Sequence, residues 1–449
     1  MSEVRVPPGP KALIPMTTLI AFRKDPIPFL TRATAAFGDR VYLKAGKRHI
    51  YILNTPESAQ DVLVTQQNSF RKGFALQRVK SMLGEGLLTS EGDLHLRQRR
   101  MIQPMFHRQH IAGYAETMLS MTERVTQGWQ DGVTLDIHEQ MMRLTLLIVA
   151  KTLFDVDVDA NAGEIGQVVT TLITSFFSTL GPLAELRLRL PLPASKRLLA
   201  ARAQLESTIQ TMIAERRTGS DHGDLLSMLI AAQDDEDHNR HMDDKQVRDE
   251  VLTLFLAGHE TTANALAWTF YLLSQNPEAT QKLHAELDSV LTAGRAPTYA
   301  DLENLPYTRM ILTESMRLYP PAWIVTREAL EDVNVGGFAI PKGATILISQ
   351  WVVHHDERYY PQPLRFDPER WSPTNPAAAR PKMSYFPFGA GARLCIGEPF
   401  AWMEGILLLA AIAQKWDMTL EPGFPVELLA QITLRPKHGM RMKLTKRDR

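Results

Sequence analysis

The segment FPFGAGARLCIGEPFAW, residues 386–402, contains the chain's single cysteine, Cys395, with three glycines close to it. A cysteine in a core needs only apolar neighbours, whereas glycines let a backbone turn tightly and approach another group closely. The residues after the cysteine are typical of a first helical turn, and the apolar run that follows predicts a helix over residues 399–416. A sulfur ahead of that helix faces the positive end of the helix dipole, which favours a thiolate.

Three roles are open for Cys395 on this evidence: a buried structural residue, the nucleophile of a cysteine hydrolase, and the axial ligand of haem iron. A lone cysteine of unknown surroundings is most often structural. The hydrolase interpretation lacks a local histidine signature. Because the chain has one cysteine, a disulfide framework, a Cys-rich zinc site and a Cys-ligated iron–sulfur cluster within it are excluded.

The composition is that of an ordinary globular protein of 449 residues, 44% hydrophobic and 22% charged. Fifty basic residues balance fifty acidic ones, and no Lys/Arg cluster is interleaved with aromatic residues, so nothing indicates a nucleic-acid partner. The apolar stretch at residues 12–22 is interrupted by Pro15 and is shorter than the ~20 residues of a membrane span. With no signal-peptide pattern, we expect a soluble, cytoplasmic protein without a stable membrane anchor.

The hydrophobic pattern is mainly helical with a smaller β portion. Predicted helices and strands, in chain order, are a helix at 28–37, strands at 41–46 and 48–54, helices over most of 56–290, a helix at 307–319, strands within 333–340 and 344–350, and a strand-like end at 431–444. The longest and most apolar helix covers 246–273. Without a clean linker, we expect a single domain, 1–449, whose β-rich part is about 38–70 plus the C-terminal strands.

Two stretches interrupt the helical pattern. Residues Gly181–Pro193 are predicted to be a mobile connection, and Asp234–Asp244 a solvated charged loop. His238 and His241 in that loop could bind a metal, but a charged surface loop is the better interpretation.

The spacing of Phe388, Gly391, Arg393, Cys395 and Gly397 is F-x-x-G-x-R-x-C-x-G, which resembles the haem-binding signature of the cytochrome P450 family without a substitution. The resemblance implies the fold of that family, a triangular α-rich prism with a long central helix over the haem. It also implies haem b, iron protoporphyrin IX, with the cysteine as axial thiolate. The glycines would let the loop bring its sulfur onto the iron.

On the long apolar helix, residues 257–262, AGHETT, resemble the family's oxygen-activation motif. Glycine inside a helix costs roughly 1 kcal/mol relative to alanine, and a carboxylate in an apolar run is also costly. A small residue at Gly258 would let O2 or a flat ligand lie against the backbone, while Glu260 and Thr261 would deliver protons and hold dioxygen. Taken alone, Glu260 could equally be a solvent-facing residue of an amphipathic helix.

Glu314 and Arg317 resemble the family's E-x-x-R element, whose spacing places acid and base on one helix face. Such a pair means little alone, because exposed helices contain many of them. The resemblance implies that Arg370 joins them in a buried charge network that holds the cysteine loop. Trp371 stands where phenylalanine is usual, and we expect this difference to affect packing only.

The resemblance also implies residues that bind the two haem carboxylates, since buried charges require partners. Arg99, Arg327 and Arg393 would each pair with a propionate. His95 stands where many members have tryptophan and keeps an N–H donor.

The implied reaction is insertion of one oxygen atom of O2 into a hydrophobic substrate, by hydroxylation or epoxidation. No fused reductase pattern is present, so a separate ferredoxin with its reductase, or a flavodoxin, would supply electrons. Arg97, Arg100 and Lys382 are candidate docking residues. Ser175–Leu190 would belong to the substrate pocket, as would Phe74, Leu83, Ala257, Trp323, Ile324, Val325 and Thr433.

The candidate pocket segments are mostly apolar, which favours a bulky hydrophobic substrate. Three segments, 96–106, 318–329 and 431–436, are similar to those of bacterial members that oxidise terpenes or carotenoids. The first segment of the chain also resembles fatty-acid hydroxylases. We expect a terpenoid, with a fatty acid as the alternative. A haem sensor or carrier that never turns over is the rival of another class, and Leu186–Leu192 is expected to be a short amphipathic loop.

Overall fold

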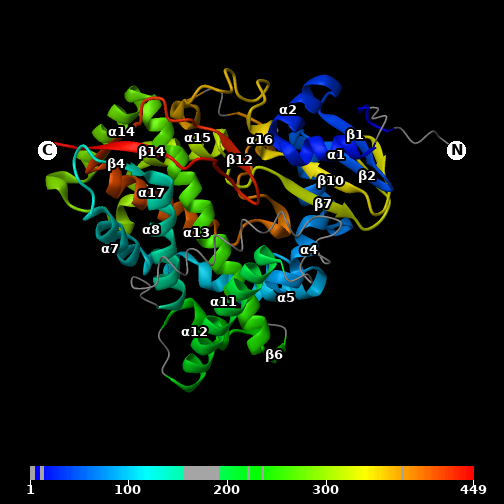
Figure 1. Cartoon of the computed structure of the whole chain (residues 1–449), viewed down its shortest axis with the longest axis horizontal. Coiled ribbons are helices and arrows are strands. Elements are labelled where there is room, and N and C mark those ends of the chain that lie inside the picture. Colours follow the sequence, from blue (N-terminus) through cyan, green and yellow to red (C-terminus); the bar gives the residue numbers. More distant parts are fainter. Residues whose placement is uncertain are drawn as a thin grey trace. The chain divides into compact units, whose positions relative to one another are not determined.

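The computed structural model describes residues 6–10, 15–155, 192–219, 223–234, 237–375 and 379–448. Contacts divide the chain into two compact units. The first comprises Met1–Gln77, Thr313–Cys395 and Thr433–Arg435, and the second comprises Arg78–Leu312, Ile396–Ile432 and Pro436–Arg449. The first unit contains the largest sheet, and the second contains most of the long helices (Figure 1).

A five-stranded sheet organises the first unit. Its strands, in spatial order, are β1 (Arg40–Ala45), β2 (Arg48–Leu53), β10 (Thr345–Ile348), β7 (Val325–Ala329) and β3 (Phe70–Lys72). Strands β2 and β10 are parallel, and the other neighbours are antiparallel. Tyr51, Phe70, Ile346 and Phe386 share one buried cluster, so the sheet and the start of the cysteine segment have a common core.

The other elements of the first unit are short. They are α1 (Pro15–Lys24), α2 (Pro26–Phe37), α3 (Pro56–Gln60), η1 (Asp61–Thr65), η2 (Gln67–Ser69), β8 (Val333–Val335), β9 (Phe338–Ile340), α16 (Gln350–His354), η6 (Pro368–Trp371), η8 (Lys382–Ser384) and η9 (Gly391–Arg393). The strand β13 (Leu434–Pro436) begins in the first unit and ends in the second. Two helices, α4 (Phe74–Leu83) and α15 (Pro306–Leu318), each begin in one unit and end in the other.

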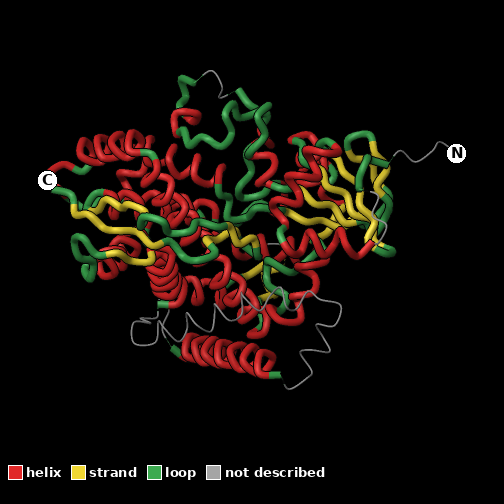
Figure 2. The backbone as a smooth tube through the Cα atoms, turned by 45° about the horizontal axis from the view of Figure 1, so that its top comes forward, coloured by secondary structure: helices red, strands yellow, loops and turns green. Residues whose placement is uncertain are grey.

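The second unit is built mainly of helices (Figure 2). They are α5 (Gly92–Ile102), η3 (Gln103–Phe106), α6 (Arg108–Ala112), α7 (Ala115–Thr126), α8 (Ile137–Phe154), α11 (Pro193–Thr218), α12 (Leu225–Ala231), α13 (Asp244–Gln275), α14 (Pro277–Val290), η4 (Thr292–Gly294), η5 (Tyr299–Asn304) and α17 (Glu398–Ala413). Its strands are β4 (Thr134–Asp136), β5 (Gln233–Asp234), β6 (Asp237–His241), β11 (Trp416–Leu420), β12 (Leu428–Ala430) and β14 (Arg441–Lys446).

The longest helix of the described chain, α13, packs along α8 (Figure 1). Asp243 caps its N-terminus by accepting a hydrogen bond from Gln246 N at 2.7 Å. The helix extends two residues beyond each end of the predicted range. Between positions 249 and 270 every residue is buried except four, Leu256, Ala257, Gly258 and Thr261. One short face at the middle of an otherwise enclosed helix is therefore open.

The expected fold class, mainly α with a smaller β portion, is confirmed. The charged loop expected at Asp234–Asp244 is wrong in part, because β5 and β6 pair there as an antiparallel hairpin. Most of the expected connection at Gly181–Pro193 lies outside the described residues, and α11 begins at its last residue. The single-domain expectation stays a prediction.

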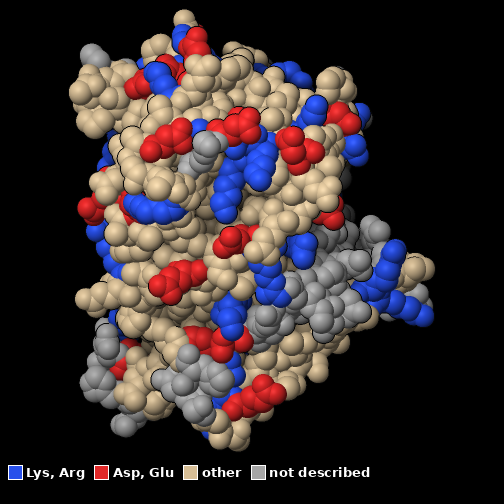
Figure 3. Space-filling model, turned by 90° about the vertical axis from the view of Figure 1, so that its left-hand side faces the viewer, with Lys and Arg blue, Asp and Glu red and all other residues tan. Residues whose placement is uncertain are grey.

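Two further observations concern the surface charges and the helices of the described residues. On the face drawn in Figure 3, acidic and basic side chains are interspersed. Among the described residues, no helix combines the length and the apolar character that crossing a bilayer requires.

Candidate functional site

Main-chain hydrogen bonds fix the cysteine segment in the first unit. Cys395 N donates to Phe388 O at 2.9 Å, which closes the loop between the first residue of the motif and its cysteine. Inside it, Leu394 N donates to Gly391 O at 3.0 Å. Cys395 itself is exposed and forms no disulfide. The loop therefore holds an accessible sulfur on a fixed backbone.

Gly391 is needed because the loop passes close to the backbone of Leu63. Its φ of +69° lies in the left-handed region, and a Cβ there would be 1.9 Å from Leu63 O. The next residue, Ala392, donates its N–H to Gln67 Oε1 at 2.6 Å. The glycine thus lets the loop pack on η1 and η2, and its service to the approach of sulfur to iron stays a prediction.

Three cations of the first unit belong to the strands and the loop near this motif. Arg393 Nη1 donates to Phe70 O at 3.2 Å, and Arg327 Nη1 donates to Thr326 O at 3.0 Å. Lys72 on β3 lies directly opposite Arg327 on β7, and both residues are buried. Like charges directly opposite each other destabilise a strand pair, so an anion close to both would offset their repulsion.

Sequence reasoning missed Lys72. The signal was available, because alternation along a strand places Lys72 on the same face as the core residue Phe70. A lysine on the buried face of a strand requires an explanation in terms of charge.

These residues fit haem by their chemistry. An exposed thiol on a loop fixed by backbone hydrogen bonds is a suitable iron ligand, and buried arginine and lysine side chains are suitable partners for two carboxylates.

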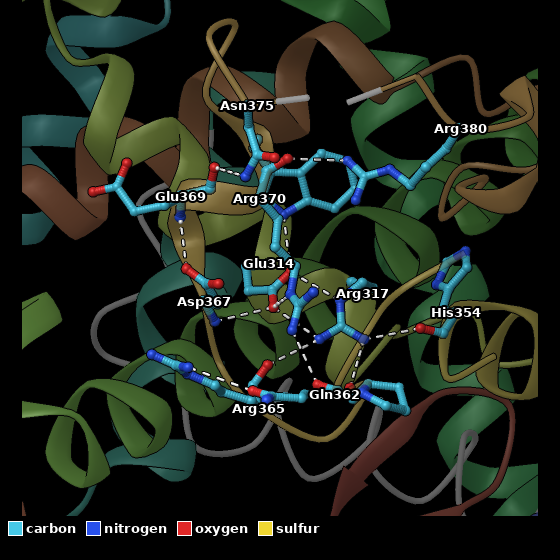
Figure 4. A network of polar contacts seen from close by, with 12 residues as sticks. Glu314, Arg317, His354, Gln362, Arg365, Asp367, Glu369, Arg370, Asn375 and Arg380 are labelled. Carbon is cyan, nitrogen blue, oxygen red and sulfur yellow. Dashed lines mark hydrogen bonds and ion pairs between the residues drawn. The ribbon is translucent and has the colours of Figure 1, made fainter. Parts of the chain in front are cut away.

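Glu314, Arg317 and Arg370 lie together in the first unit (Figure 4). Arg317 Nε and Nη2 donate to the two oxygens of Glu314 at 2.8 Å each, and both side chains are fully buried. Arg370 Nε lies 3.3 Å from Glu314 Oε1, and Arg370 Nη2 donates to Gln362 O at 3.0 Å. The bidentate pair is the strongest geometry available to an arginine and a carboxylate.

Trp371 does more than pack, so the expectation that its difference from phenylalanine affects packing only is wrong. Its Nε1 donates to Glu314 Oε2 at 2.9 Å. The backbone N–H of Asp367 donates to Glu314 Oε1 at 3.1 Å. The indole thus provides a fourth hydrogen bond to a buried carboxylate, one that phenylalanine could not supply.

His354 connects this network to the cysteine segment. Arg317 Nη1 donates to His354 O at 2.9 Å, and Phe386 N donates to His354 Nε2 at 3.1 Å. Burial, the largest cause, holds the pKa of His354 well below its ordinary 6.5. The imidazole is therefore neutral, as an accepting Nε2 requires. Sequence reasoning missed His354, because its role depends on two contacts far apart in the chain.

The AGHETT motif lies at the middle of α13 in the second unit. Thr261 Oγ1 donates to Ala257 O at 2.9 Å, and both residues belong to the open face of the helix. Glu260 is buried, which excludes the solvent-facing alternative. His259 is buried against α8, where Thr145 Oγ1 donates to its carbonyl at 2.9 Å, and burial lowers the pKa of His259 to about 4.

Gly258 has a packing role. A Cβ at this position would be 3.0 Å from Val149 Cγ2 on α8. The glycine therefore allows close contact between α8 and α13, and its missing side chain does not point to the open face as the sequence interpretation required. Of the four residues of α13 that are not buried there, Ala257 and Thr261 lie one turn apart and carry side chains on the open face.

The expected propionate residues of the second unit lie on α5. His95 is buried, with Nδ1 3.4 Å from Ser90 Oγ, and Arg99 is half-buried on the same helix. Two candidate docking residues on this helix have partners within the chain. Arg97 Nη2 donates to Gln246 Oε1 at 3.2 Å, and Arg100 Nη2 lies 3.2 Å from Asp234 Oδ1.

Two buried acids on α13 fix the loop between α4 and α5, and sequence reasoning missed both. Glu85 N donates to Asp249 Oδ2, and Leu87 N donates to Glu250 Oε2, each at 2.8 Å. Gly84 has a φ of +77°, and a Cβ there would be 2.2 Å from the Asp249 carboxyl group. This loop ends just before the helix that carries His95, so the two acids help to place that helix.

The expected pocket residues divide between the units. In the first unit, the Arg48 guanidinium lies 3.8 Å from the Phe74 ring centroid, Trp323 and Thr433 are buried, and Ile324 and Val325 are half-buried. In the second unit, Leu83 is buried and Ala257 is exposed. The segment Ser175–Leu190 lies outside the described residues. A shared pocket stays a prediction.

Comparisons with known proteins point to one family. The family model described as cytochrome P450 matches residues 7–441. Cyclooctatin synthase of Streptomyces melanosporofaciens is 40% identical over 96% of this chain and 93% of its own length. Cyclooctat-9-en-7-ol 5-monooxygenase of the same species is 38% identical over 93% and 90% of the two chains. Pentalenene oxygenase of Streptomyces avermitilis is 35% identical over 94% of each.

A solved structure gives the same result. Retinoic-acid-bound cyanobacterial CYP120A1 has a TM-score of 0.90 and 27% identity, and the match covers 99% of this chain and 100% of that one.

Proposed function

Because the chain belongs to the cytochrome P450 family and is a monooxygenase of that family, we propose that it oxidises a terpenoid, with haem b held by Cys395. The observation that carries the cofactor assignment is the exposed cysteine on its hydrogen-bonded loop. Bound haem supplies the activation of O2 from which one oxygen atom enters the substrate.

The protein's own residues hold the cofactor. Cys395 would hold the iron through its sulfur, on a backbone fixed by the hydrogen bond from its N–H to Phe388 O. In the first unit, Arg327, Arg393 and Lys72 would pair with carboxylates of the haem. In the second unit, His95 and Arg99 would have the same role. Pairing with carboxylates offsets the cost of burying these cations.

Glu260 and Thr261 handle protons. Thr261 is on the open face of α13, with its hydroxyl hydrogen donated to Ala257 O, so its oxygen can accept a proton or a hydrogen bond from a group at that face. Glu260 is the adjacent buried acid. An acid next to a hydroxyl is a suitable pair for passing protons to a reacting group at this face.

The substrate class rests on the relatives and on the apolar pocket candidates. Two of the relatives are named for oxygenation of cyclooctat-9-en-7-ol and of pentalenene. The candidate pocket side chains in this chain are mostly hydrocarbon, as expected for a site that binds a polycyclic hydrocarbon or its alcohol.

Electrons come from a separate ferredoxin with its reductase, or from a flavodoxin, and the protein acts in the cytoplasm as a single domain. Among the three docking candidates, Lys382 is exposed on η8, while Arg97 and Arg100 are partly engaged within the chain. We therefore rank Lys382 first as a contact for an acidic redox partner.

The test is an optical titration of the ferric protein with a cyclic sesquiterpene, a cyclic diterpene alcohol and a long-chain fatty acid, followed by turnover with a surrogate ferredoxin system. A Soret shift and an oxygenated product with a terpenoid support the proposal. A response to the fatty acid alone would replace the substrate class. Binding without turnover of any of them would favour the sensor or carrier alternative.

Thr261→Ala separates a turnover enzyme from a carrier. Losing the hydroxyl should lower product formed per electron consumed by about tenfold or more, with haem content unchanged. Thr269→Ala is the matched control, because Thr269 Oγ1 donates to Ala265 O on the same helix but is fully buried. Equal coupling in Thr261→Ala and wild type would contradict the assigned role.

A further inference from the structure

His354 is a buried histidine whose imidazole contacts two aromatic residues where the cysteine segment begins. It is the last residue of α16, and its exposed fraction is zero. The ring stacks on Tyr385, with centroids 5.2 Å apart and an interplanar angle of 29°. The Phe386 ring meets it edge-on, at 5.4 Å and 80°. Packing against both rings fixes the orientation of the imidazole.

The imidazole holds one end of the cysteine loop. Its Nε2 accepts a hydrogen bond from Phe386 N at 3.1 Å, and Phe386 O accepts one from Gly389 N at 3.0 Å. Both backbone polar groups of Phe386 therefore have a partner. Further along the loop, Ala392 N donates to Gln67 Oε1 at 2.6 Å. The loop thus has one side-chain anchor at its start and another inside the motif.

The backbone of His354 belongs to the charge network. Arg317 Nη1 donates to its carbonyl at 2.9 Å (Figure 4), and the same guanidinium forms the bidentate pair with Glu314. His354 therefore offers two acceptors, a carbonyl to the network and a ring nitrogen to the cysteine loop. Two hydrogen bonds through one residue link the buried arginine to the backbone of Phe386.

The bond from Phe386 requires a neutral ring. An Nε2 that accepts a hydrogen bond carries no proton, so the proton is on Nδ1. Burial is the main reason that the pKa of His354 is well below 6.5, and interactions with His355 and Arg317 lower it further. Backbone groups of Met316 and Arg317 act in the opposite direction. The ring is therefore an acceptor at neutral pH.

We propose that His354 is a positioning residue, whose ring nitrogen holds Phe386 and through the cysteine loop keeps the Cys395 sulfur in place as a ligand. Without this acceptor the buried Phe386 N–H is left unpaired, and the loop must shift to satisfy it. The link to Cys395 as a ligand rests on the proposed function, whereas the anchoring of Phe386 does not.

The absorption spectrum of the reduced protein with carbon monoxide tests the position of the sulfur. His354→Phe keeps an aromatic ring and removes the acceptor, so the red-shifted Soret band should decay about tenfold faster than in wild type, as expected for one unpaired buried N–H. His354→Gln supplies a new acceptor, its amide oxygen, and should restore the rate to within about twofold of wild type.

His355→Phe is the matched control for the spectrum. His355 is the adjacent histidine, but its ring stacks on Trp351 at 4.2 Å and its Nδ1 lies 2.7 Å from Trp351 O. Its replacement should leave the decay of the Soret band at the wild-type rate.

Hydrogen exchange tests the anchor independently of the ligand assignment. In His354→Phe, the amides of residues 384–395 should exchange about tenfold faster than in wild type, because the start of the loop opens more often. Peptides that cover β11 and β14, in the other unit, should exchange at the wild-type rate. His354→Gln should restore the protection of residues 384–395.

The outcomes separate this anchor from the proposed function. Equal Soret decay or equal exchange in His354→Phe and wild type overturns the positioning role, as does the same acceleration in His355→Phe. A wild type without the red-shifted band overturns ligation by Cys395, and the exchange experiment then decides the anchor alone. If His354→Phe does not fold, His354→Asn replaces it, because the shorter amide does not reach Phe386 N and should show the same faster decay.

Discussion

Two buried glutamates of this protein have opposite environments. Glu314 accepts four hydrogen bonds, from Arg317 Nε and Nη2, from Asp367 N and from Trp371 Nε1. Glu404 is equally buried, and neither of its oxygens has a partner among the described residues. Burial alone therefore does not determine what a carboxyl group does.

The difference is in the donors that surround each carboxyl group. Arg317, one of the donors to Glu314, extends the network through His354 to Phe386, at the start of the cysteine segment. Among the described residues, burial is the main influence on the pKa of Glu404 and the Thr262 hydroxyl is the one polar neighbour that affects it. A carboxyl group that is buried without donors holds its proton to a higher pH than an exposed one.

Removing Arg317, the partner of Glu314, should have the largest effect on the free energy of unfolding. Arg317→Ala leaves Glu314 buried with its main partner lost, and we expect a loss of about 3–5 kcal/mol in the free energy of unfolding, measured by denaturant titration. Arg358→Ala is the control, because Arg358 is about half exposed (53%) in its pair with Asp39 and should cost less than about 1 kcal/mol. Equal losses would refute the distinction.

The raised pKa of Glu404 should make the free energy of unfolding depend on pH. The folded pKa of Glu404, about 8, is above the ordinary 4.5, so the folded state binds more protons between these values. The unfolding free energy of wild type should therefore fall as pH rises through that window, by up to about 1.4 kcal/mol per pH unit. Glu404→Gln should remove this contribution. Parallel curves for the two proteins from pH 5 to 8 would show that Glu404 ionises normally.

The hydrogen bond from Trp371 to Glu314 can be tested by a smaller change. Trp371→Phe keeps the aromatic packing and removes one hydrogen bond to a buried carboxylate, at an expected cost of about 2 kcal/mol. Trp402→Phe is the control, since Trp402 Nε1 donates to the partly exposed Glu398 at 3.3 Å and the loss should be under about 1 kcal/mol. A cost for Trp371→Phe no greater than for Trp402→Phe would reduce the indole to a packing residue, as the sequence suggested.

The sequence predicted what depends on local pattern. Strong apolar periodicity located α13 to within two residues at each end, and the strand pair β1 and β2 followed from alternation. The motif around Cys395 identified the family, because its spacing is set by the chemistry of one loop.

Features that depend on contacts between distant segments could not be predicted in the same way. Glycine is needed at position 391 because a side chain there would collide with the backbone of Leu63. At position 258 a side chain would press on Val149 of a neighbouring helix. The role of His354 requires both Arg317 and Phe386. In the sequence, Glu404 is simply one acid in an apolar helix. The structure adds that neither of its oxygens has a hydrogen-bond partner among the described residues.

The central claim, that Cys395 is the thiolate ligand of haem, is tested most directly by the absorption spectrum of the reduced protein with carbon monoxide. The account predicts that wild type shows the strongly red-shifted Soret band that a thiolate ligand to the iron would give. Cys395→His, which offers a neutral ligand on the same loop, should bind haem without that shift. Identical Soret positions in wild type and Cys395→His would contradict the assignment.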